Sequence, residues 1–218
     1  YITLIEQEKI ELKKKIILLN NDYFKNFFFR KKFLIRNHFA LKYLADKKVF
    51  SLINQIEKFL KFDLGFCEKM YNFNNSYYDD KTIQIKSDNI NSLQLSNLLK
   101  NIDEKLIFLN TTKQILKEPL KTNHKFIHIH PGYLPYLKGM DCSLWGISKR
   151  NKLGVSSFFI NNEIDCGEII DREELEAPKF FFENQKDYNN YDKYCIWFSF
   201  FDPLLRAAHL KKILKLKI

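Results

Sequence analysis

The sequence contains few cysteines, and none of them is spaced to bind zinc together. Its four cysteines lie far apart and form no C-x-x-C pair: Cys67, Cys142, Cys166 and Cys195. Zinc-ribbon spacing is therefore absent, and a long lysine-rich chain of this kind is not a disulfide-dense secreted scaffold. We expect four free thiols in a reducing cytosol, and hence a cytoplasmic protein.

A signal peptide and a long apolar run are also missing. The first fifteen residues, YITLIEQEKIELKKK, carry charges where a signal peptide needs an apolar stretch. The most apolar window, residues 194–201, is far too short to span a bilayer. We therefore expect no membrane partner. The chain begins with Tyr1 rather than Met, as a processed or trimmed form would.

Neither a P-loop nor a G-x-G-x-x-G motif occurs, so nothing supports nucleotide binding by those routes. The chain is 45% hydrophobic and 16% aromatic, which excludes a disordered protein, and its 218 residues can bury a real core. The net charge of +10 invites a nucleic-acid partner. The lysines are scattered rather than clustered, however, so we expect no nucleic-acid binding.

Short apolar segments alternate with amphipathic ones along the chain, which predicts an α/β fold with a mostly parallel sheet and flanking helices. We expect a catalytic domain over residues 1–176 and a helical, aromatic extension over 177–218 packed on it. The predicted strands are 15–20, 39–44, 82–86, 106–110, 125–130 and 155–160. The predicted helices are 23–36, 49–60, 92–102 and 202–216, with a loop over 67–80.

The few glycines are concentrated in one segment, which indicates where the site lies. Five of the six lie within residues 126–170, and only Gly65 lies outside. Glycine is used where the backbone needs a positive φ or a close approach to another group. The same segment contains a predicted strand that ends in His130, and sites in parallel α/β sheets lie beyond the carboxyl ends of the strands. We therefore place the active site in residues 126–170.

Two histidines and an aspartate in this segment could carry chemistry. His128 and His130 alternate along the predicted strand, so their side chains share one face. They could bind a metal ion together with Asp165, or one histidine oriented by that carboxylate could transfer protons. The two histidines could also simply be polar residues that cap the strand end. The Asp-x-Gly sequence at Asp165 could likewise be only a turn. The residues alone leave these alternatives open.

Taken together, the motifs resemble those of the folate-dependent formyltransferases, whose pattern is Asn-x-His-Pro, Leu-Pro-x-x-[Arg/Lys]-Gly and Asp-x-Gly-x-Ile. The order, spacing and flanking strand agree over residues 126–170, whereas the first half agrees only as an α/β pattern. Residues 130–135 are most similar to the sugar N-formyltransferases of surface-glycan biosynthesis. The matching residues are His130-Pro131-Gly132-Tyr133-Leu134-Pro135-x-x-Lys138-Gly139, Leu144-Trp145, Gly154-Val155 and Ile164-Asp165-x-Gly167-x-Ile169-Ile170.

The resemblance implies a Rossmann-like formyltransferase fold, 10-formyltetrahydrofolate as co-substrate and the amine of an amino sugar as acceptor. That sugar would be nucleotide-linked and used for lipopolysaccharide or another surface glycan, and no metal ion is implied. His130 matches the family's catalytic histidine, and Asp165 matches the aspartate that pairs with it. Lys138 could neutralise an acceptor phosphate, position its loop, or be an ordinary solvated lysine. The positions that match the folate site are Leu134, Pro135, Asp165 and Gly167.

One position departs from the family pattern, because His128 stands where the family has Asn. An amide donates a hydrogen bond at any pH, whereas an imidazole donates in a given direction only in the right tautomer or when protonated. His128 could serve as a catalytic substitute with an altered pH dependence, or it could mark an inactive folate-binding protein. Glycinamide ribonucleotide and methionyl-tRNA are alternative acceptors, although too little chain follows Ile170 for the extra domain of the tRNA enzymes. The aromatic C-terminal segment would suit a homodimer interface.

Overall fold

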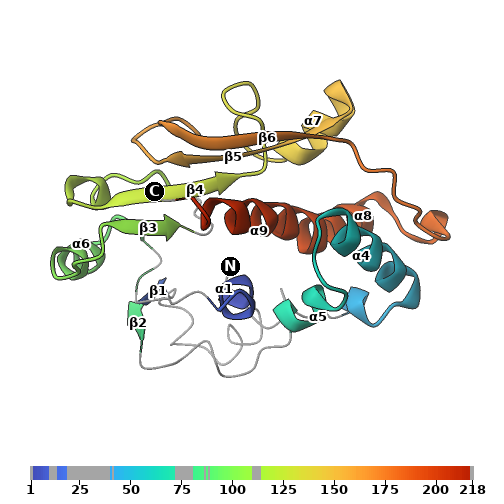
Figure 1. The fold of residues 1–218 in the computed structure, drawn as a ribbon, viewed down its shortest axis with the longest axis horizontal. Coiled ribbons are helices and arrows are strands. Elements are labelled where there is room, and N and C mark those ends of the chain that lie inside the picture. Colours follow the sequence, from blue (N-terminus) through green and yellow to red (C-terminus); the bar gives the residue numbers. More distant parts are fainter. Residues whose placement is uncertain are drawn as a thin grey trace. The chain divides into compact units, whose positions relative to one another are not determined.

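The computed structural model of the chain divides into two units, and Figure 1 labels their helices and strands. The first comprises Tyr1–Leu12, Asp22–Asp80 and Pro178–Lys211, and the second comprises Lys13–Asn21, Lys81–Ala177 and Lys212–Ile218. The predicted division into residues 1–176 and 177–218 stays a prediction, and the predicted helix 23–36 lies outside the described residues. The structure describes residues 2–9, 14–18, 40, 42–71, 81–85, 87, 89–109 and 114–216.

The second unit confirms the predicted α/β class and contains a mixed sheet. Strands β3 and β4 pair in parallel, whereas β4–β5 and β5–β6 pair antiparallel. The sheet follows chain order: β3 (Leu106–Leu109), β4 (Lys125–His130), β5 (Lys152–Phe159) and β6 (Ile169–Glu176). Two further strands, β1 (Lys15–Leu18) and β2 (Thr82–Ile85), pair in parallel with each other. Parallel pairing was expected through most of the sheet, and among the described strands it covers β1–β2 and β3–β4.

Helices α6 (Leu93–Lys100) and α7 (Cys142–Arg150) and the 3₁₀ turn η2 (Pro119–Lys121) belong to the same unit. The hydroxyl of Ser92 caps α6 by accepting the backbone N–H of Leu95, and α7 packs against β5. One apolar core joins α6 to the strands, because aliphatic side chains from both meet Phe126 of β4. Its buried members are Ile85, Ile90, Leu95, Leu99, Ile102, Leu116 and Phe126.

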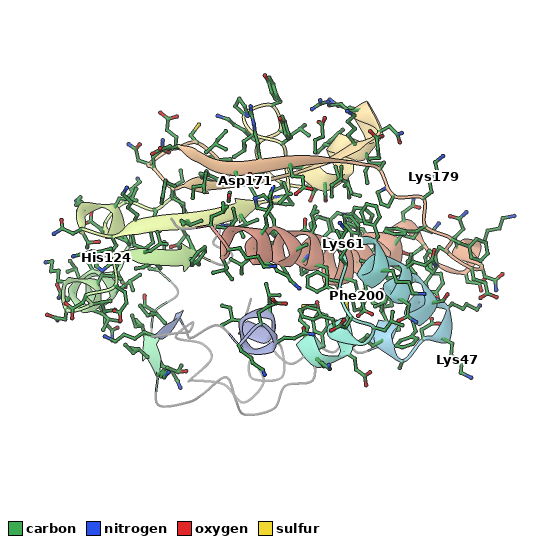
Figure 2. All side chains as sticks on the ribbon, in the orientation of Figure 1. Lys47, Lys61, His124, Asp171, Lys179 and Phe200 are labelled. Carbon is green, nitrogen blue, oxygen red and sulfur yellow. The ribbon has the colours of Figure 1, made fainter. Side chains whose placement is uncertain are left out.

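The described part of the first unit is helical and aromatic. Its core contains the fully buried rings of Phe66, Phe200 and Phe201, and Figure 2 labels Phe200. The buried carboxylate of Glu57 accepts the N–H groups of Gly65 and Cys67, and so fixes the turn into α5. The elements are α1 (Ile2–Gln7), α4 (Lys47–Phe59), α5 (Phe66–Tyr71), η3 (Gln185–Asp187), α8 (Asn190–Ile196), the π-helical turn η4 (Trp197–Phe201) and α9 (Asp202–Ile213), whose last two residues belong to the second unit. No described helix has the length and apolar character needed to cross a membrane.

Several predicted elements are confirmed, and others need correction. The helix predicted over 49–60 and the strands predicted over 82–86 and 106–110 occur at nearly those positions, as α4, β2 and β3. The strand predicted over 39–44 is wrong, because residues 40 and 42–44 are helical. A short apolar run cannot be told from a buried helix by its pattern, and Ala40 and Tyr43 are both buried at helical spacing. The start of the predicted loop 67–80 is also wrong, since it lies within α5.

The predicted C-terminal helix begins earlier than Asp202, because α8, η4 and α9 follow one another without a break. Pro203 lacks an N–H and cannot bond the carbonyl of Ser199 four residues before it, so a proline inside a helix normally breaks or kinks it. The phenol of Tyr71 donates to that carbonyl. A π-helical turn also precedes the proline, so both the geometry and the hydrogen bonding are adjusted locally.

Candidate active site

His130 ends β4 with its imidazole held between two acceptor oxygens. The side chain is 3% exposed, with Nδ1 3.5 Å from Oδ2 of Asp165 and Nε2 2.9 Å from the carbonyl oxygen of Leu137. A carbonyl can only accept a hydrogen bond, so Nε2 carries the proton that faces Leu137. A second proton on Nδ1 would face the carboxylate. Both ring nitrogens of His130 thus face acceptor oxygens.

Asp165 is held by its own loop and by the loop after β4. Its Oδ2 accepts the backbone N–H of Gly139 at 2.7 Å, and Asp165 itself has φ +46°. Gly167 turns the chain two residues later with φ +138°, where an added Cβ would lie 1.9 Å from the carbonyl oxygen of Phe159. Only glycine fits there without a shift of the backbone. The structure thus brings together two of the predicted site residues, His130 and Asp165.

His128 shares the β4 face with His130 but has different neighbours. Its Nδ1 lies 3.1 Å from the carbonyl oxygen of Leu109, and its ring packs edge-on against Phe158, with centroids 5.9 Å apart. Across the part of the chain that the structure describes, no group of three His, Cys, Asp or Glu side chains is arranged to hold a metal ion. His124, which precedes β4 (Figure 2), contacts Thr122 and the carbonyl of Ile102 instead.

The loop after His130 folds back onto β5. Leu134 is buried and precedes Pro135 through a cis peptide bond. The hydroxyl of Ser156 donates to the carbonyl of Gly132 at 2.8 Å and accepts the N–H of Leu134 at 3.0 Å. The guanidinium of Arg172 donates to the carbonyl of Leu134 at 2.7 Å. The predicted folate-site residues Leu134 and Pro135 are therefore held from the sheet side.

The ammonium of Lys138 lies 2.6 Å from the sulfur of Cys166. This hydrogen bond raises the pKa of Lys138 above its usual value, although partial desolvation of the ammonium acts in the opposite direction. The contact joins the two loops that meet at Asp165. Lys138 therefore has a local partner here, in addition to the roles considered from the sequence.

Three side chains that bind the loops of the site were not predicted: Ser156, Arg172 and Cys166. Ser156 lies two residues after Gly154, and the only sequence signal for it is that alternate residues of a strand face the same side. Arg172 lies in a highly charged segment that has no strand pattern. Three large apolar side chains are also exposed in the loops near Asp165: Tyr136, Met140 and Ile164.

No protein-family model and no curated protein matches this chain. Among solved structures, it is similar to phosphoribosylglycinamide formyltransferase from Campylobacter jejuni, with 22% identity, TM-score 0.41, and coverage of 66% of this chain and 71% of that one. It is also similar to a sugar N-formyltransferase from a Shewanella species, with 15% identity, TM-score 0.39, and coverage of 92% of this chain and 72% of that one. A third similar structure is phosphoribosylglycinamide formyltransferase from Streptococcus pneumoniae, with 14% identity, TM-score 0.43, and coverage of 94% of this chain and 100% of that one. Because these similarities are low, function has to be inferred from the residues of the site.

Proposed function

We propose that this chain transfers a formyl group from 10-formyltetrahydrofolate to the primary amine of an amino sugar. The observation that carries the proposal is the His130–Asp165 pair at the end of β4, with Nδ1 and Oδ2 3.5 Å apart. Both residues belong to the motifs that resemble the folate-dependent formyltransferases. Their pairing supports the acid–base interpretation of the two histidines and the aspartate.

The reaction requires one proton to leave the attacking amine and one to reach the departing nitrogen. The new bond joins the amine nitrogen to the formyl carbon, and the bond from that carbon to the folate nitrogen breaks. In this scheme the Nδ1 proton of the His130 imidazolium, which faces Asp165, is donated to the developing oxyanion and then to the departing nitrogen, while Nε2 keeps its hydrogen bond to the carbonyl of Leu137. Donors aimed at such an oxyanion typically contribute ~2.7–4 kcal/mol each.

Asp165 has two roles in the proposal. Its negative charge stabilises the imidazolium of His130, and it can accept the proton of the amine, directly or through water. The N–H of Gly139 holds the carboxylate in place at 2.7 Å. We assign His128 the role that an asparagine has in the family pattern, as a third polar group on the same face of β4.

We propose that the folate binds beside the loop that contains Leu134 and Pro135 and against the turn formed by Asp165 and Gly167. Two features support a preformed site for a partly apolar ligand there. The backbone of the loop is already fixed by Ser156 and Arg172. Exposed apolar side chains also lie in the adjoining loops, with Tyr136 72%, Met140 81% and Ile164 61% exposed.

We infer a nucleotide-linked amino sugar as the acceptor, because residues 130–135 are most similar to those of the sugar N-formyltransferases. Such a substrate would place the protein in the cytoplasm, at a step of lipopolysaccharide or other surface-glycan biosynthesis. The catalytic pair itself is compatible with other primary amines. Glycinamide ribonucleotide is therefore the first alternative acceptor to include in an assay.

Thermal unfolding with a non-transferable analogue of 10-formyltetrahydrofolate tests the folate site without requiring the acceptor. A ligand at about 100 times its dissociation constant stabilises the folded state by ~2.7 kcal/mol, which is an easily visible rise in Tm. The p-aminobenzoylglutamate half of the analogue, at the same concentration, is the control and should give little shift. No shift with the complete analogue at saturating concentration would contradict the proposal.

A further inference from the structure

We infer that Ser156 and Arg172 are positioning residues that hold the loop after His130 in its folate-binding geometry. The inference rests on the proposed function, and it concerns two residues outside the motifs that suggested that function. Neither residue is assigned a part in the chemistry. Both act through the backbone of residues 131–135.

The three residues occupy one row across the sheet. His130 of β4 is directly opposite Ser156 of β5, and Ser156 is directly opposite Arg172 of β6. Residues opposite each other in neighbouring strands share a face of the sheet. The side chains of Ser156 and Arg172 therefore lie on the face over which the loop folds after leaving His130.

Ser156 contacts the loop at two points. Its side chain is completely buried, and its single hydroxyl donates to the carbonyl of Gly132 and accepts the N–H of Leu134. A hydroxyl has one donor and two acceptor positions, so both kinds of bond are used on one loop. Removing the oxygen would leave two buried backbone groups without this partner, and such groups are costly to leave unpaired.

Arg172 binds the other polar backbone group of Leu134. It donates to the carbonyl of Leu134, the residue whose N–H is bound by Ser156, and its guanidinium lies 4.8 Å from the ring centroid of Tyr133. A charged donor makes the stronger kind of hydrogen bond, and the aromatic face adds a cation–π attraction. Both polar groups of Leu134 are thus fixed from the sheet.

Gly154 shows how closely the loop approaches the strand. A Cβ at this position would lie 2.2 Å from the backbone nitrogen of Tyr133. Gly154 and Ser156 share a face because they are two residues apart in β5. Gly154 thus leaves space for the loop, and Ser156 binds it.

This anchoring affects the proposed chemistry because the loop joins the two functional parts of the site. Leu134 and Pro135 contact the folate in the proposal, and the carbonyl of Leu137 sets the proton position on His130. A displacement of about 1 Å in a catalytic site can cost about a hundredfold in rate. We call the contacts of Ser156 and Arg172 with this loop the brace. We therefore expect loss of the brace to weaken folate binding as well as to slow the reaction.

Ser156→Ala and Ser157→Ala form a matched pair for the test. Both serines are completely buried neighbours in β5, and both hydroxyls donate to a carbonyl, but that of Ser157 donates to Asp171 on β6. In Ser156→Ala we expect the Leu134 amide to exchange its hydrogen at least tenfold faster and the dissociation constant of the folate analogue to rise about tenfold. In Ser157→Ala both quantities should stay within about twofold of the wild type. Ser156→Thr keeps the hydroxyl and should restore both.

Arg172→Gln, with Arg150→Gln as its control, covers the case in which Ser156→Ala does not fold. Arg172 is exposed and binds the loop, whereas Arg150 forms an ion pair with Glu174. Weaker analogue binding in Arg172→Gln alone is the expected result. Unchanged Leu134 exchange in Ser156→Ala, or unchanged analogue binding in Arg172→Gln, would overturn the inference. Absence of analogue binding in the wild type would instead refute the proposed function, and the exchange measurement would still show whether the brace exists.

Discussion

One carboxylate oxygen of Asp165 has two partners: it accepts the backbone N–H of Gly139 at 2.7 Å and faces Nδ1 of His130 at 3.5 Å. The shorter contact fixes the carboxylate on the loop after β4. The longer one leaves the imidazole within reach of its charge. A residue 35 positions further along the chain thus supplies an acceptor oxygen beside a strand-end histidine.

Asp165→Asn should therefore reduce formyl transfer with little effect on folding. The amide cannot stabilise an imidazolium or accept a proton, and general acid–base groups contribute about 10²–10⁴-fold to rates. We expect kcat to fall within that range while Tm stays close to that of the wild type. Asp171→Asn on β6, whose carboxylate pairs with Lys212, is the control and should keep its activity (Figure 2). Near-normal kcat in Asp165→Asn would show that the pair is not catalytic.

His128→Asn should keep formyl transfer. An amide donates a hydrogen bond at every pH, whereas an imidazole donates in a given direction only in the right tautomer or when protonated. The asparagine of the family pattern should therefore serve at this position at least as well as His128. The measurement is kcat of both proteins with the same acceptor. No turnover by either protein, with any amine, would favour an inactive folate-binding protein.

Gly167→Ala should destabilise the fold more than Gly139→Ala. Both glycines have positive φ, but an added Cβ meets the carbonyl oxygen of Phe159 at 1.9 Å in the first case and open space in the second. We expect about 1 kcal/mol of backbone strain at Gly139 and an additional loss of about 1–3 kcal/mol at Gly167 from the collision. Urea unfolding midpoints give the difference. Equal losses would mean that the turn before β6 is less tightly packed than described.

Acid should remove a stabilising contribution of Asp46. Burial acts to raise the pKa of this carboxyl, but hydrogen bonds from the phenol of Tyr188 and the N–H of Lys48 outweigh it and lower the pKa below the ordinary 3.8. Stability gained in this way is present above that ordinary value and is lost as the pH falls through the lower, folded value. Asp46 also caps α4.

Asp46→Asn separates these two roles, because Asn is also a good N-cap but does not titrate. The difference in urea midpoint between the wild type and this variant should be largest at neutral pH and should shrink below about pH 4. Tyr188→Phe removes one donor and should reduce the same difference. A difference that is constant with pH would contradict the lowered pKa of Asp46.

His130 and Asp165 could be found from the sequence because local patterns mark both of them. One ends an apolar strand before a proline and a glycine, and the other lies in an Asp-x-Gly turn after the next strand. Ser156 and Arg172 could not be found in this way. Their roles depend on the register of two antiparallel pairings, and a change of one residue would turn each side chain to the opposite face.

The charged sequence of β6 also explains why that strand was missed. Its acidic residues have cationic partners in the fold, with Glu174 near Arg150 and Lys152, and Asp171 near Lys212. None of these partners can be identified by alternation of apolar and polar residues. Similarly, the sequence does not show that the helix continues through Pro203. The phenol of Tyr71 donates to the carbonyl that Pro203 cannot bond, and Tyr71 is distant in sequence.

Release of tetrahydrofolate tests the central claim most directly. Purified protein would be incubated with 10-formyltetrahydrofolate and a set of nucleotide-linked amino sugars, with glycinamide ribonucleotide included, and compared with His130→Ala. We predict amine-dependent release of tetrahydrofolate with at least one sugar, together with a formylated product of matching mass, and near-complete loss of both in His130→Ala. Release that is equal in the two proteins, or no release with any amine although the folate analogue binds, would contradict formyl transfer at this site.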